Sequence, residues 1–119
     1  MDCSLNLLVI RCRDIEASKQ FYANIGMKFQ KEQHGKGAEH YAAEFGSLVF
    51  ELYPLQDNEN PDRTRLGFSV THLIEKANLL RSENYCIIQD IQEFANELRM
   101  LVQDPDGRSV ELRQSIQIG

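Results

Sequence analysis

The chain has 119 residues, a formal net charge of −5 and a hydrophobic content of 42%. This length suits one domain with its own core, and the negative charge disfavours nucleic acid and anionic membrane surfaces, which attract Lys and Arg. The sequence has three scattered cysteines without a CxxC pair, no apolar run of membrane-spanning length and no secretory leader pattern. We therefore expect a cytoplasmic protein with reduced thiols.

The first part of the chain predicts a strand, a helix and three more strands. Aliphatic and β-branched residues over 5–12 are typical of a strand. Asp14 suits the N-cap of the following helix, and Gly26 suits its end. The apolar and polar alternation then predicts strands over 27–32, 39–45 and 47–53.

The second part repeats this order after a polar linker, Gln56 to Asp62. Residues 65–73 resemble residues 7–15 at an offset of 58. The predicted elements are a strand around Leu66, a helix over 73–83 and strands near 85–91, 98–103 and 108–114, with 93–97 as an irregular loop. The fold class is therefore α+β: two βαβββ modules, about residues 1–55 and 63–119, form one domain with a cupped mixed β-sheet and flanking helices.

Strand alternation separates the side chains into two faces. Apolar residues such as Phe50 and Leu112 belong to the face that the helices cover, so their neighbours point away from it. The opposite, helix-free face then carries polar candidates for a ligand site: Arg11, Glu51, Tyr53, Arg65, Glu111 and Arg113. We interpret it as a partly polar, concave cavity; an open, solvated face with weak surface ion pairs is the alternative.

Three motifs, together with the repeated βαβββ order, resemble the glyoxalase I, bleomycin-resistance and extradiol-dioxygenase superfamily, also called vicinal oxygen chelate proteins. The motifs are Arg13-Asp14-Ile15-Glu16-Ala17-Ser18 running into Phe21-Tyr22, then Ile25-Gly26-Met27, and Asp104-Pro105-Asp106-Gly107 ahead of Val110-Glu111-Leu112. The resemblance spans essentially the whole chain. It implies the fold described above and suggests a homodimer.

The resemblance also implies a set of four metal-ligand positions, on the first, fourth, fifth and eighth strands. They fall on Leu7, Glu51, Arg65 and Glu111. Leucine has no donor atom and a guanidinium has no lone pair, so we expect no metal and no other cofactor. Arg65 is instead predicted to bridge the two carboxylates in place of the metal. If that bridge is buried, losing Arg65 costs about 3–5 kcal/mol of folding free energy.

These patterns favour metal-independent binding of a small organic molecule, with Arg11 and Arg113 contacting an anionic group and Tyr53 at the cavity mouth. The alternative is a glyoxalase-like lyase or isomerase that uses Glu51 and Glu111 as metal ligands or as general acid and base. A structural or regulatory partner-binding module is the third hypothesis. His40 is the one histidine placed to reach the cavity, although an ordinary strand histidine is the favoured interpretation.

Overall fold

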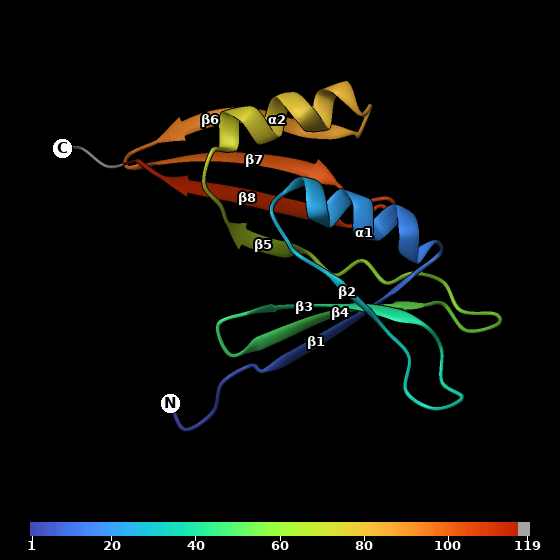
Figure 1. Cartoon of the computed structure of the whole chain (residues 1–119). Helices are drawn as coiled ribbons and strands as arrows, with labels where there is room; N and C mark the ends of the chain where they lie inside the picture. Colours follow the sequence, from blue (N-terminus) through green and yellow to red (C-terminus); the bar gives the residue numbers. More distant parts are fainter. Residues whose placement is uncertain (117–119) are drawn as a thin grey trace. The chain divides into compact units, whose positions relative to one another are not determined.

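The computed structural model describes residues 1–116 of the chain and contains two compact units, residues 1–62 and the segment that begins at Arg63. Each unit holds one helix and a four-stranded sheet in the order strand, helix, strand, strand, strand (Figure 1). The α+β class and the paired βαβββ modules are therefore confirmed. In the described part of the chain, no helix is both long and apolar enough to span a membrane.

The first unit has the sheet order β1-β4-β3-β2, in which β1 pairs parallel with β4. Its elements are β1 (Leu7–Cys12), α1 (Ile15–Asn24), β2 (Gln30–Glu32), β3 (His40–Phe45) and β4 (Leu48–Pro54). The strand predicted over 27–32 is shorter than expected. Gly26, at φ 117°, and Met27 still cap the helix, and the Met27 N–H donates to the carbonyl of Tyr22, so pairing starts only at Gln30.

The second unit repeats this topology with the order β5-β8-β7-β6, and β5 is parallel to β8. Its elements are β5 (Leu66–Ser69), α2 (Leu73–Ser82), β6 (Ile87–Phe94), β7 (Glu97–Gln103) and β8 (Ser109–Ser115). The irregular loop predicted over 93–97 is wrong. Phe94 pairs with Glu97, so a tight turn joins the two strands, and its Ala-Asn sequence lacks the glycine that would have marked it.

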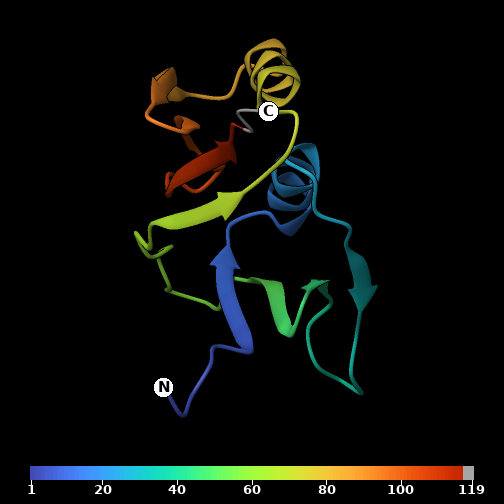
Figure 2. The same ribbon diagram turned by 90° about the vertical axis from the view of Figure 1, so that its left-hand side faces the viewer.

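Each helix packs on one face of its own sheet, and within the described part of each unit no helix covers the other face, which we call the helix-free face (Figures 1 and 2). In the first unit the ring of Tyr22 meets that of Phe50 edge to face, with centroids 5.2 Å apart. In the second unit Leu80 from α2 and Leu112 from β8 are fully buried. The alternation predicted from sequence is confirmed, and it directs Glu51 and Glu111 away from the helices.

The turn between β7 and β8 is fixed by a buried ion pair. One Asp104 oxygen accepts hydrogen bonds from the backbone N–H groups of Asp106 and Arg108. The buried Arg108 guanidinium lies 3.2 Å from the other Asp104 oxygen and 3.4 Å from the Asp106 carboxylate. Gly107 completes the turn at φ 90°, a conformation that favours glycine. This turn sets the β7–β8 register and thereby places Glu111.

Candidate functional site

A row of four side chains crosses the helix-free face of the first unit. The row consists of Arg11 from β1, Tyr53 from β4, His40 from β3 and Glu32 from β2. Arg11 is in register with Tyr53, and His40 is in register with Glu32. Cross-strand partners lie side by side on one face of a sheet, so the topology alone aligns these groups.

Aromatic and cationic contacts hold this row together. The Tyr53 ring stacks on the His40 imidazole with centroids 4.1 Å apart and planes within 10°. The Arg11 guanidinium lies 5.0 Å from the Tyr53 ring centroid, within range of a cation–π interaction, and donates to the carbonyl of Pro54. Desolvation, and then the charge of Glu51, raise the pKa of Tyr53 above its usual value, against the effect of Arg11. Tyr53 therefore acts as a neutral phenol at physiological pH.

Glu51 joins the row through His40. A Glu51 carboxylate oxygen lies 3.4 Å from His40 Nε2, and the Tyr53 hydroxyl lies 3.3 Å from the same nitrogen. The His40 side chain is only 1% exposed, and that of Glu51 is 16% exposed. The imidazole is thus a packed group with one nitrogen directed at a carboxylate, which allows proton transfer or metal ligation.

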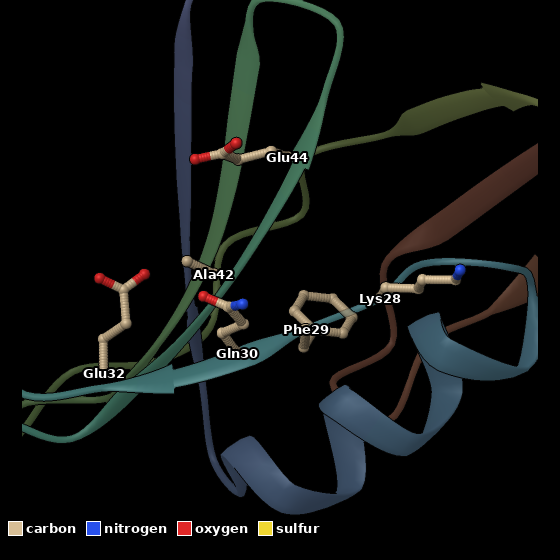
Figure 3. A pocket seen from close by; sticks show the side chains of 6 residues that line it. All are labelled: Lys28, Phe29, Gln30, Glu32, Ala42 and Glu44. Carbon is tan, nitrogen blue, oxygen red and sulfur yellow. The ribbon is translucent and has the colours of Figure 1, made fainter.

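A hollow of about 350 Å³ opens next to this row. It lies along β2 and β3 and is lined by Lys28, Phe29, Gln30, Glu32, Ala42 and Glu44 (Figure 3). Glu32 belongs to both the row and the hollow. The wall of the hollow is mostly polar. The volume of the hollow is at the lower end of the range for small-molecule sites.

In the second unit the helix-free face is dominated by ion pairs around Glu111. Arg65 donates to one Glu111 oxygen at 3.1 Å and Arg113 donates to the other at 2.5 Å. The hydrogen bond from Arg113, and then that from Arg65, lower the pKa of Glu111 below its usual value. Arg113 also approaches Glu97, which pairs with Arg99. Each carboxylate oxygen of Glu111 is therefore already paired with a guanidinium group.

The exposure of Arg65 changes one expectation. Its side chain is 62% exposed, while that of Glu111 is 19% exposed. The pair therefore lies at the surface, so the loss of 3–5 kcal/mol expected for a buried bridge does not apply; exposed pairs contribute about 1 kcal/mol or less. The predicted bridge from Arg65 to Glu51 stays a prediction, because Glu51 lies in the other unit.

Comparison with known proteins decides the family. The family model of the Glyoxalase/Bleomycin resistance protein/Dioxygenase superfamily matches residues 4–112. The chain belongs to this superfamily. No curated protein sequence matches the chain.

Solved structures of the superfamily fold resemble the chain over nearly its full length. An integron cassette protein from the mobile metagenome of V. cholerae is 25% identical, with a TM-score of 0.69, over 96% of this chain and 97% of that one. An antibiotic-binding protein from a Streptomyces species is 18% identical, with a TM-score of 0.75, over 97% and 98%. The oxidase ChaP-H2 is 13% identical, with a TM-score of 0.77, over 100% and 98%. At such low identity, the last two show a shared fold alone.

Two of the four positions at which the resemblance predicts metal ligands hold side chains that cannot ligate a metal. Leu7 is exposed and offers no donor atom, and Arg65 places a cation against the carboxylate of Glu111. Only Glu51 and Glu111 keep ligating side chains.

His40 contributes more to this face than its sequence pattern indicates, and no sequence pattern pointed to Glu32. His40 was given more weight as an ordinary strand histidine, yet it contacts Tyr53 and Glu51 directly. Strand alternation could have placed His40 on the same face as Glu51, because His40 is two residues before Ala42, which pairs with Glu51. That signal becomes usable only when the register of β3 on β4 is known.

Proposed function

We propose that this protein binds a small organic molecule on the helix-free face of its first unit, without a metal at the superfamily's four ligand positions. The observation that carries the proposal is the stacked row of Arg11, Tyr53 and His40 beside the hollow at β2 and β3. An aromatic ring next to a guanidinium favours a planar molecule with an anionic group.

The second unit supports the metal-independent part of the proposal. A metal ion at Glu111 would have to displace Arg65 and Arg113 from the carboxylate. The anion contact predicted for Arg113 belongs to this second unit and is a separate prediction from ligand binding on the first unit: its side chain is 44% exposed and pairs with Glu111 and Glu97.

The fold neighbours are compatible with ligand binding. The Streptomyces neighbour is described as an antibiotic-binding protein, and it shares the fold over nearly the whole of both chains. A protein that only binds its ligand does not need metal ligands at the positions of Leu7 and Arg65. The same fold thus serves binding when the shape and charge of the helix-free face suit the molecule.

A thermal-shift screen of the full chain against planar aromatic acids and aromatic antibiotics tests this function. We expect at least one compound to raise the unfolding midpoint through linkage. Calorimetric titration of that compound should then show roughly tenfold weaker binding in Arg11→Met and in Tyr53→Leu, because each removes one part of the stacked row. Arg81→Met, on the exposed side of α2, is the matched control. Equal affinity in all four proteins would contradict the proposed site.

A lyase or isomerase of the glyoxalase type is the second candidate, favoured by the contact of Glu51 with His40. A carboxylate 3.4 Å from an imidazole can pass a proton to or from a bound molecule. We do not assign Glu111 a role in proton transfer, because both of its oxygens accept hydrogen bonds from arginines. Mass spectrometry of each screened compound after incubation separates the candidates: conversion that stops in Glu51→Gln supports the enzyme, and an unchanged compound supports binding alone.

A further inference from the structure

Three side chains that can ligate a metal meet at one edge of the first unit. They are Glu32 at the end of β2, His34 in the following loop and His40 at the start of β3. One ligand atom from each lies within 4.8 Å of the other two. β2 is the edge strand of its sheet. His34 is exposed, Glu32 is partly exposed and His40 is buried, so a metal ion would reach the cluster from the side of His34.

His40 is oriented as a metal-binding histidine is. Its Nδ1 lies 3.2 Å from the carbonyl oxygen of Ala38. A carbonyl can only accept, so this contact requires the proton on Nδ1. In that tautomer the lone pair is on Nε2, where the Tyr53 hydroxyl lies 3.3 Å away and a metal would take its place. Histidine ligands in metalloproteins commonly donate their second N–H to a carbonyl in this way, which fixes both tautomer and ring orientation. Stacking on Tyr53 holds the buried ring in place.

The charges around the cluster favour a cation. A Glu32 carboxylate oxygen lies 3.3 Å from His34 Nε2, and Glu51 lies 3.4 Å from His40 Nε2. Two carboxylates thus flank two imidazoles. Tetrahedral ligation at bond lengths near 2.1 Å needs ligand atoms about 3.4 Å apart, a spacing that Glu32 and His34 already show. His34 is 75% exposed on a loop, so it has room to close the remaining distance to His40.

We propose that Glu32, His34 and His40 form a binding site for a divalent first-row transition metal, with Glu51 beside it. Two histidines and one carboxylate are a set that zinc and non-haem iron sites use, and three protein ligands leave positions open for water or a bound molecule. None of the three residues stands at a superfamily ligand position. The inference goes beyond the proposed function and does not depend on it.

Nuclear magnetic resonance of the imidazole nitrogens tests the site directly, because the chain has three histidines. Zinc added to chelator-treated full-length protein should shift the ligating nitrogens of His34 and His40. His72, the exposed residue at the start of α2, should not respond and serves as an internal control. Before zinc is added, His40 should already show the Nδ1–H tautomer. A zinc response at His72 alone, or at no histidine, would overturn the proposal.

Calorimetric titration with zinc gives the matched comparison. We expect one zinc ion per chain and at least about tenfold weaker binding in His34→Asn, which removes an exposed ligand at little risk to folding. His72→Asn should bind as the parent does; asparagine tolerates the left-handed backbone there, at φ 55°.

Three results would overturn the site. One is the absence of stoichiometric zinc in the parent, and another is loss of binding in Glu111→Gln rather than in His34→Asn. The third concerns the exposed thiols of Cys3 and Cys86. A thiolate-to-metal charge-transfer band after cobalt is substituted for zinc would assign the metal to these cysteines instead.

Discussion

The carboxylate of Glu111 decides what the second unit presents on its helix-free face. The resemblance predicts a metal ligand at this position, and Arg65 and Arg113 each bind one of its oxygens. Arginine stays charged at every physiological pH and carries no lone pair. The two guanidinium groups therefore compensate the charge of the carboxylate but offer no atom that could ligate a metal.

A pH-dependent contribution to stability follows from the lowered pKa of Glu111. Since the folded-state pKa lies below the ordinary value of about 4.5, the contribution is fully present above that pH and is lost as pH falls through the folded-state pKa. We expect Glu111→Gln to lower the free energy of unfolding by about 1 kcal/mol or less at pH 7, and the difference to disappear in strong acid. Urea unfolding across this pH range measures it. A difference that grows in acid would contradict the assigned ion pairs, and Glu93→Gln is the exposed control.

At the scale of elements, the β7–β8 turn depends on one buried arginine. Arg108→Met keeps most of the side-chain volume but leaves the buried Asp104 carboxylate without its cation. Removing one partner of a buried pair costs about 3–5 kcal/mol, and we expect that loss in the free energy of unfolding. Chemical denaturation of Arg108→Met against the exposed control Arg81→Met checks it. Similar small losses in both variants would mean that the turn holds without the pair.

Local patterns predicted most elements because each follows from a short-range rule. Alternation assigned Phe50 and Leu112 to the covered face, and Asp14 caps α1 as expected, since its side chain accepts from the N–H groups of Glu16 and Ala17. The same rules placed Glu51 and Glu111 on the helix-free face. They missed the turn at residues 95–96, because Asn96 is its one typical turn residue and no glycine follows it.

The remaining part of the site depends on pairing between distant strands, which no local pattern encodes. His40 meets Tyr53 and Glu51 only because β3 pairs with β4 in one register, and it meets Glu32 only through the pairing of β2 with β3. A shift of one residue would turn His40 to the helix-covered face. The burial of Arg108 was equally unpredictable, because its sequence neighbours are polar and its ion pairs form through the turn.

At the scale of the whole molecule, the two units share one topology but differ on their helix-free faces. The first combines stacked aromatic and imidazole groups with a hollow, and the second carries alternating ion pairs around Glu111. Repetition of a βαβββ module thus conserves the packing of helix on sheet and frees the opposite face to vary. We place ligand binding on the first unit's face for this reason.

The assembly state is a separate prediction. We expect a homodimer, which for a specific interface buries at least about 1,000 Å² in total. Light scattering at micromolar concentration should therefore give twice the chain mass of 13.7 kDa. Dilution should lower the measured mass towards that of the monomer only at concentrations well below the micromolar range. A monomer mass throughout would contradict the prediction.

Native mass spectrometry of the full chain with a compound from the thermal-shift screen tests metal-independent ligand binding most directly, because it reports bound metal and bound ligand together. We predict that the ligand stays bound after treatment with a chelator, in the parent and in His34→Asn. The contradicting result is release of the ligand by the chelator, with binding restored by added metal in both of these proteins but not in Glu111→Gln. That result would place an essential metal at the superfamily's ligand positions.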